Sequence, residues 1–349
     1  MTSNRFPVVF IAFSARYLRV VIKTPRQRAL LAFVLCVLVS CFVTKAQSQV
    51  IKVGIADHTV SQIALYVGKD NGYYTAEGLA VDLVLMSGAV SNLALIGGNV
   101  EFTTVPTAGL TAAVRGAPLR VLSTTFSRPV WSLYSKPDIT SVKTLKGKRI
   151  ATGGFGSATD ILLRELLNKY DLEPSRDLAL LSVGSTSARL NALISGSVDA
   201  AVLPIPFNFN AQDAGFRQLL SFVNEGLVLL TGSIVVRENT LEMNSILVQK
   251  FIRATLKGHL YVRDNRSGTI PILARNIHVK GDLAAKIYDS VRPAMAEDGT
   301  ISVGTQKKLI DEIARLRGLK DVPPAEKFFD FSPVRKAAAE LQIAGWQPR

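Results

Sequence analysis

Short apolar runs alternate with segments of helical hydrophobic spacing along most of the chain. The run Val50–Ile55 predicts a strand, and the segment Ser61–Asp70 carries apolar side chains three and four residues apart, which predicts a helix. The same order recurs to about residue 203, so we predict α/β structure with mainly parallel sheets. The further predicted strands are Ala80–Met86, Val100–Val105, Leu119–Thr124, Ile150–Thr152, Leu178–Leu181 and Val198–Leu203, and the predicted helices are Val90–Ile96, Leu110–Arg115, Ala158–Lys169 and Ser187–Ile194.

The last third of the chain has a mainly helical pattern. It begins after Gly226–Arg237, an apolar stretch that we interpret as a strand pair leading back to the first half of the chain. This return predicts two lobes: lobe 1 is discontinuous and consists of residues 50–130 plus 236–349, and lobe 2 consists of residues 131–235. The predicted helices after the return are Leu241–Arg263, Leu283–Ala294, Thr305–Arg317 and Arg335–Leu341.

A short pattern occurs twice, 98 residues apart. Ala94–Pro106 and Ala192–Pro204 both read Ala-Leu-Ile-x-Gly-x-Val, then an acidic residue, four further residues and Pro. Each copy predicts the end of a helix, a stop at Gly, and a buried strand that an acid opens and Pro closes. Two copies are too few for a solenoid. They favour two similar lobes with a ligand cleft between them, the alternative being a chance match.

The first 46 residues differ from the rest of the chain. They hold seven Lys or Arg residues and no acid, and the apolar run Ala29–Val43 is followed by small and polar residues. About 20 apolar residues are needed to span a membrane, so we predict a signal peptide over residues 1–46 that is cut after Ala46. The sequence Leu38-Val39-Ser40-Cys41 resembles the lipobox of bacterial lipoproteins, which leaves lipidation of Cys41 open as an alternative.

Charge and cysteine content exclude several function classes. The net charge of the whole chain is +14, but residues 47–349 carry 34 basic and 27 acidic residues, a net charge of +7 that gives no indication of nucleic-acid binding. Both cysteines, Cys36 and Cys41, lie in the predicted signal peptide. The exported chain therefore has no disulfide, thiol nucleophile or thiolate metal site. Nucleophile-elbow, zinc-protease and phosphate-loop motifs are missing from the sequence, so we predict no catalytic residues, no metal and no cofactor.

Several motifs occur in the order and spacing of a known family. Together they resemble the solute-binding proteins of bacterial ABC importers, in the branch that takes up taurine, alkanesulfonates, nitrate and thiamine pyrimidine precursors. The resemblance covers about residues 50–345. The motifs are Gly72-Tyr73-Tyr74-x2-Glu77-Gly78-Leu79-x-Val81, Gly98-x-Val100-Glu101, Leu145-Lys146-Gly147-Lys148-Arg149-Ile150-Ala151, Gly156-Ser157 and Phe331-Ser332-x-Val334.

The resemblance implies a fold and a function. The implied fold is the two-lobed periplasmic-binding fold of the second type, with a hinge and an interlobe cleft. A periplasmic monomer would capture a small, anionic or sulfonate-like molecule in that cleft and deliver it to an ABC permease with its ATPase at the inner membrane. A yeast enzyme of this branch uses a His and a Cys-rich iron-binding stretch, which this chain lacks after export. A secreted enzyme on the same fold and a ligand-sensing domain are the alternatives.

Five loops are candidates for the ligand site, because ligands of open α/β sheets bind beyond the carboxyl ends of the strands. The clearest is Gly153–Asp160, where glycine amides, a helix N-terminus and the hydroxyl of Ser157 or Thr159 suit an anion. The alternative is that these hydroxyls only cap the helix, and Asp160 argues against a strongly charged ligand. The other loops are Asp57-His58-Thr59, Ser87-Gly88-Ala89, Pro106-Thr107 and Pro204–Phe207.

Four further side chains are candidates with open alternatives. Arg128 follows a strand near the predicted hinge and suits a carboxylate or sulfonate, although a solvated Arg is the alternative. An exposed or structural role is the alternative for His58, and Phe155 and Phe207 suit stacking on a ligand. The predicted ligand-binding residues are Asp57, His58, Thr59, Ser87, Gly88, Pro106, Thr107, Arg128, Gly154, Phe155, Gly156, Ser157, Thr159, Pro204 and Phe207.

Overall fold

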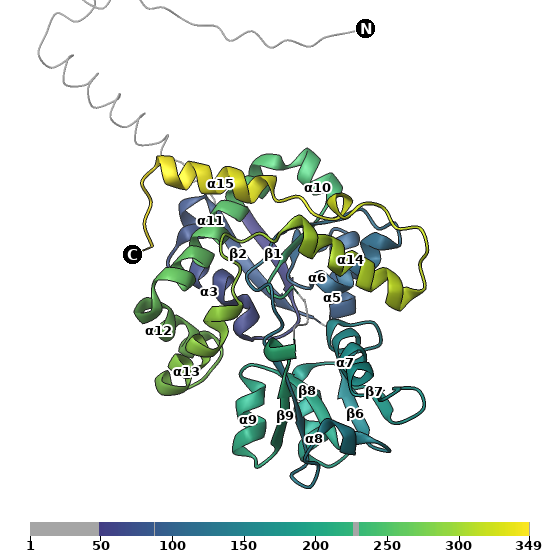
Figure 1. The fold of residues 1–349 in the computed structure, drawn as a ribbon. Helices are drawn as coiled ribbons and strands as arrows, with labels where there is room; N and C mark the ends of the chain where they lie inside the picture. Colours follow the sequence, from purple (N-terminus) through teal and green to yellow (C-terminus); the bar gives the residue numbers. More distant parts are fainter. Residues whose placement is uncertain (1–48, 87, 226–229, 349) are drawn as a thin grey trace, which may run out of the picture. The chain divides into compact units, whose positions relative to one another are not determined.

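The computed structural model describes residues 49–86, 88–225 and 230–348. They form two five-stranded mixed sheets with helices packed on them (Figure 1). We keep the names lobe 1 and lobe 2 for the parts of the chain that form the first and the second sheet. Among the described residues, no helix has the length and apolar character needed to cross a membrane. The predicted signal peptide, Cys41 and Ser87 lie outside the described residues.

The sheet of lobe 1 has the order β2-β1-β3-β10-β4. Strands β1, β2 and β3 are parallel, and β10 is antiparallel to both of its neighbours, so four of the five strands run in one direction. The alternating apolar runs predicted this direction because parallel strands need helical crossovers. The bounds are β1 (Gln49–Ile55), β2 (Leu79–Leu85), β3 (Phe102–Thr103), β4 (Leu119–Ser123) and β10 (Ile234–Arg237).

The sheet of lobe 2 repeats this layout in the order β7-β6-β8-β5-β9. Strands β6, β7 and β8 are parallel, and β5 in the fourth position is antiparallel to its neighbours. The chain therefore leaves the first sheet after β4 and returns to it at β10, as a discontinuous lobe 1 requires. The bounds are β5 (Trp131–Ser135), β6 (Arg149–Thr152), β7 (Ala179–Ser182), β8 (Ala200–Pro204) and β9 (Arg217–Ser221).

The helices agree with most predicted segments and differ at four places. The predicted helix Leu241–Arg263 is two helices, α10 and α11, separated at Asn244, and α4, α9 and α12 were not predicted. The bounds are α3 (Ile63–Asp70), α4 (Tyr73–Ala76), α5 (Gly88–Ile96), α6 (Pro106–Val114), α7 (Ala158–Lys169), α8 (Thr186–Ile194), α9 (Phe207–Asp213), α10 (Glu238–Met243), α11 (Ser245–Asp264), α12 (Arg266–Asn276), α13 (Gly281–Val291), α14 (Val303–Arg317) and α15 (Ser332–Ile343).

The two copies of the repeated pattern occupy equivalent places in the two sheets. The acid of each copy pairs with the neighbouring strand in the same way: the Glu101 carboxylate accepts from the Lys52 amide at 2.7 Å, and the Asp199 carboxylate accepts from the Arg149 amide at 2.9 Å. The Glu101 amide in turn donates to the Lys52 carbonyl, and the Asp199 amide donates to the Arg149 carbonyl. The repeated acid is therefore structural, because it fixes the register between the first and third parallel strands of each lobe.

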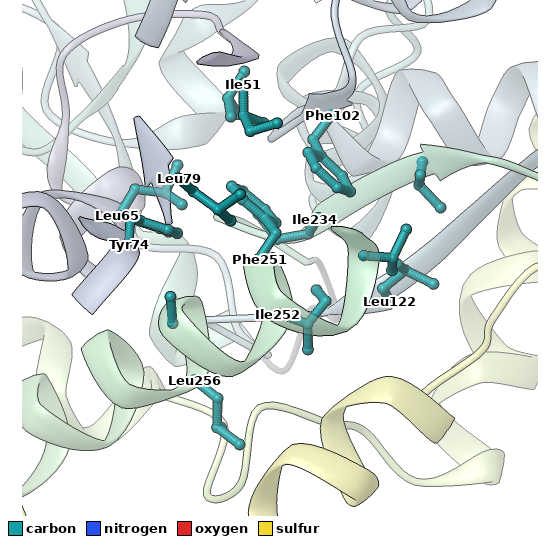
Figure 2. Close-up of a cluster of buried hydrophobic side chains, with 14 of the residues drawn as sticks. Ile51, Leu65, Tyr74, Leu79, Phe102, Leu122, Ile234, Phe251, Ile252 and Leu256 are labelled. Carbon is teal, nitrogen blue, oxygen red and sulfur yellow. The ribbon is translucent and has the colours of Figure 1, made fainter. Parts of the chain in front are cut away.

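The core of lobe 1 is built around Phe251 of α11. Its ring stacks on Phe102 with centroids 4.0 Å apart and on Tyr74 at 5.3 Å, and the surrounding side chains are aliphatic (Figure 2). One turn of α11 lies directly against α3, where a side chain on Gly258 would clash with the Ala64 carbonyl. This close packing holds α3, and with it the loop after β1, in a fixed position below the cleft described next.

Two crossing segments connect the lobes and lie side by side. Phe126 and Thr231 exchange both backbone hydrogen bonds, at 3.1 and 3.2 Å, and the Thr125 hydroxyl donates to the Gly232 carbonyl at 3.0 Å. Phe126 is fully buried, whereas the neighbouring Arg128 is exposed. A short pair of crossing segments is the kind of connection that can act as a hinge, and the hinge itself stays a prediction.

Candidate functional site

A cleft of about 290 Å³ opens where both lobes present the carboxyl ends of their parallel strands. Lobe 1 contributes the segments after β1, β2 and β3, lobe 2 contributes those at the ends of β6, β7 and β8, and the second crossing segment lines one side. The lining residues are Ala56, Asp57, Thr59, Ser61, Gln62, Gly88, Thr104, Val105, Pro106, Thr107, Ala108, Trp131, Gly153, Gly154, Phe155, Gly156, Ser157, Ala158, Thr159, Gly184, Ser185, Thr186, Arg189, Pro204, Leu230, Thr231 and Gly232.

Four helices of the described chain begin at this cleft, α5 and α6 from lobe 1 and α7 and α8 from lobe 2. Each helix N-terminus carries unpaired backbone N–H groups and the equivalent of about half a positive charge. The arrangement follows from the fold, because every helix that crosses over after a parallel strand starts at the carboxyl edge of the sheet. The cleft is therefore suited to an anion before any side-chain charge is considered.

The glycine loop before α7 leaves backbone donors free. Ser157 caps the helix and accepts from the Asp160 amide at 3.4 Å, while the Gly156 amide donates to the Asp160 carboxylate at 2.7 Å. Among the described residues, the amides of Gly154 and Phe155 have no acceptor. The predicted capping role of Ser157 is thus confirmed, and the two free amides next to it can also receive an anion.

Asp160 does not oppose an anion at this loop. Its carboxylate is almost fully buried and accepts from Arg164 Nε at 2.8 Å as well as from Gly156. Both carboxylate oxygens therefore accept hydrogen bonds from the protein, and the positive charge of Arg164 balances the negative charge of Asp160. The carboxylate acts as a support that fixes the loop shape.

Arg189, in the first turn of α8, is a lining residue that the sequence reasoning missed. It is 5% exposed and donates to the carbonyls of Val202 and Gly184, at 2.9 and 2.7 Å, and to the Thr186 hydroxyl at 3.0 Å. Burial lowers the pKa of Arg189 to about 10, against the opposing effect of the Asp57 charge. Within the described part of the chain, no carboxylate forms a salt bridge with it. The sequence did hold a signal, since Arg189 lies one helical turn before the buried Leu193.

Asp57 connects the two lobes across the cleft. Its Oδ2 accepts from the Thr186 hydroxyl at 2.6 Å and from the Thr186 amide at 3.3 Å. Thr186 is the first residue of α8, so the lobe 1 carboxylate lies on the N-terminus of a lobe 2 helix. The Thr186 hydroxyl also accepts from Arg189, which completes a chain of hydrogen bonds from Asp57 to Arg189.

The cleft brings together most of the predicted site residues. Three described ones lie apart from it: His58 is exposed with Nδ1 3.2 Å from the Tyr66 hydroxyl, Arg128 is exposed, and Phe207 packs against the lobe 2 core. Loop positions read from sequence do not show which way a side chain points. The predicted residues that line the cleft are Asp57, Thr59, Gly88, Pro106, Thr107, Gly154, Phe155, Gly156, Ser157, Thr159 and Pro204.

Apolar side chains complete the wall of the cleft. Val105, Pro106 and Leu230 line it beside the half-buried Trp131, and Phe155 lies at the glycine loop with 67% of its surface exposed. An exposed Phe next to free amides is suited to cover the apolar body of a ligand whose charged end meets those amides.

Comparisons with known proteins agree with this architecture. The model of a family described as NMT1/THI5 like matches residues 59–267. The riboflavin-binding protein RibY of Chloroflexus aurantiacus is 28% identical over 203 residues, which are 55% of this chain and 56% of that protein. The chain thus spans little more than half the length of this curated relative.

Solved structures show the same fold. The alkanesulfonate-binding protein SsuA from Xanthomonas axonopodis pv. citri bound to MOPS is 21% identical, with a TM-score of 0.67 over 80% of this chain and 98% of that one. The ligand-binding component of an ABC-type import system from Staphylococcus aureus is 15% identical, with a TM-score of 0.69 over 83% and 99%. The predicted α/β periplasmic-binding fold is confirmed, with mixed sheets.

Proposed function

The chain belongs to the NMT1/THI5-like family, and from this premise we propose that it is the extracytoplasmic solute-binding component of an ABC importer. Its ligand is a small organic anion, such as a sulfonate, that is captured between the two lobes. The protein acts as an exported monomer in the periplasm and delivers the ligand to a permease and its ATPase. It has no catalytic role in this proposal.

One observation carries the proposal: the cleft combines free backbone donors with a buried cation at the meeting point of the two lobes. The amides of Gly154 and Phe155, which have no acceptor among the described residues, are the candidate donors to the anionic group, and Arg189 adds a positive charge that water screens poorly. Backbone amides at a helix N-terminus hold sulfonates and carboxylates without a neutralising side chain.

The size and lining of the cleft support a small ligand. A volume of about 290 Å³ is at the low end of small-molecule sites, which range from about 300 to 1,000 Å³. The apolar wall around Trp131 and Leu230 favours an organic body over a bare inorganic ion. The names of two similar proteins support an organic ligand, since one is described as alkanesulfonate-binding and the curated relative as riboflavin-binding, and a third is described as part of an ABC-type import system.

The capture mechanism in this proposal is a shift between open and closed lobes. A ligand that contacts the α7 loop of lobe 2 and the α5 and α6 N-termini of lobe 1 binds the closed form better than the open form, so it stabilises closure. The paired crossing segments at Phe126 and Thr231 provide the axis. The permease recognises the closed form, which couples ligand capture to delivery.

Thermal denaturation of the chain without residues 1–46 tests the proposal, since residues 48–349 form one compact unit. The panel contains alkanesulfonates, nitrate, aliphatic and aromatic carboxylates, and neutral pyrimidines. We expect an organic anion to raise the melting temperature, because a ligand at 100 times its Kd adds about 2.7 kcal/mol to the free energy of unfolding. A shift with neutral pyrimidines alone would contradict the anion proposal, and turnover of a bound compound would favour the enzyme alternative.

A further inference from the structure

Two fixed charges line the described part of the cleft, and they cancel. Of the lining residues only Asp57 and Arg189 carry a charged side chain. They come from different lobes and are joined through the Thr186 hydroxyl, at 2.6 Å from Asp57 and 3.0 Å from Arg189. The two fixed charges of the cleft therefore balance each other at the N-terminus of α8.

Because the charges of Asp57 and Arg189 balance at the α8 end of the cleft, the charged group of a ligand is expected at the α7 end. At the N-terminus of α8, the Asp57 carboxylate already accepts a hydrogen bond from the Thr186 amide at 3.3 Å. In the loop before α7, the amides of Gly154 and Phe155, three and two residues ahead of the cap Ser157, have no acceptor among the described residues. A helix N-terminus offers about half a positive charge, which favours a negatively charged group there.

We infer that Asp57 is a specificity-determining residue, which reserves the α8 end of the cleft and lowers the affinity for doubly charged anions more than the affinity for singly charged ones. The inference rests on the proposed function. A sulfonate or carboxylate binds at the α7 loop, and its remaining interaction with Asp57 is a repulsion proportional to its charge. A phosphate monoester meets twice that repulsion, since it carries close to two negative charges above its second pKa of about 6.

Asp57→Asn tests this inference with two ligands of matched shape, propane-1-sulfonate and propyl phosphate, titrated by calorimetry at pH 8. Wild-type protein is expected to prefer the sulfonate. The variant is expected to bind the sulfonate about tenfold more tightly and the phosphate about a hundredfold more tightly, because removal of one fixed charge acts on each ligand charge. The ratio of the sulfonate affinity to the phosphate affinity is therefore expected to fall about tenfold.

Three further variants separate charge from structure. Asp82→Asn makes the same charge change at an exposed position of β2 outside the cleft, and is expected to leave both affinities within about twofold. Asp57→Glu keeps the charge and is expected to keep the preference. Thr186→Val removes the hydroxyl between Asp57 and Arg189 but neither charge, so both affinities are expected to change by the same factor.

The results distinguish an effect of the Asp57 charge from an effect of site geometry, and both from failure of the proposed function. An unchanged sulfonate-to-phosphate ratio in a folded Asp57→Asn variant overturns the inference while the proposed function stands. The same holds if Thr186→Val narrows the ratio as much as Asp57→Asn does, because geometry and not charge is then responsible. If neither wild type nor any variant binds either anion, the proposed function fails and this inference fails with it.

Discussion

Replacement of Arg189 by methionine is expected to weaken binding of an anionic ligand at least about a hundredfold, which corresponds to about 2.7 kcal/mol. Arg189 is the only positively charged side chain among the described residues that line the cleft, and it is 5% exposed. Charge interactions at a buried site are poorly screened by water. Methionine preserves much of the volume but leaves Asp57 as the one fixed charge in the cleft, so the site becomes repulsive to anions.

The measurement is a calorimetric titration with propane-1-sulfonate, supported by a circular dichroism spectrum that shows the variant is folded. Arg149→Met is the matched control, because Arg149 is in lobe 2 but pairs with Asp199 outside the cleft. Its effect is expected to stay below about threefold. Arg189→Lys keeps the charge but not the planar fork, and an intermediate loss is expected. Unchanged affinity in Arg189→Met would remove Arg189 from the site.

Phe251→Ala is expected to lower the free energy of unfolding by about 4 kcal/mol, since truncation of a buried Phe typically costs about 3 to 5 kcal/mol. The ring is fully buried and stacks on both Phe102 and Tyr74, so its removal leaves a cavity that rigid neighbours cannot fill (Figure 2). Urea denaturation followed by circular dichroism measures the change.

The matched control is Phe155→Ala, because Phe155 is 67% exposed on the cleft loop. We expect its free energy of unfolding to stay within about 0.5 kcal/mol of the wild-type value. A destabilisation of the same size in both variants would indicate that Phe155 is packed in solution, and a small effect of Phe251→Ala would contradict the described core of lobe 1.

The fold could be predicted to a large extent from hydrophobic pattern, because parallel strands are buried on both faces and leave continuous apolar runs. The helix Ala158–Lys169 has the predicted bounds, and its cap Ser157 was visible in the sequence. Strands β5 (Trp131–Ser135) and β9 (Arg217–Ser221) were missed because they mix polar with apolar residues. The predicted strand Val100–Val105 is only two residues long, since Pro106 starts helix α6.

Only the loops of the candidate site could be predicted, because the direction of each parallel strand decides at which edge of the sheet its loop lies. The predicted ends of the strands gave the positions of the loops at Asp57, Gly154 and Pro204, and the fold brings these loops to one cleft. The contact of Asp57 with Thr186 joins residues 129 positions apart in different lobes, and no local pattern encodes it. The same limit applies to Arg128, which is exposed outside the cleft.

The most direct test of the central claim is a crystal structure of the chain without residues 1–46 in complex with the tightest-binding anion of the panel. We predict that the anionic group lies within hydrogen-bond distance, about 3 Å, of the Gly154 and Phe155 amides. The organic body is expected beside Trp131 and Leu230, with both lobes in contact with the ligand. An anion bound outside the cleft, or a ligand in the cleft whose charged end faces away from the α7 loop, would contradict the account.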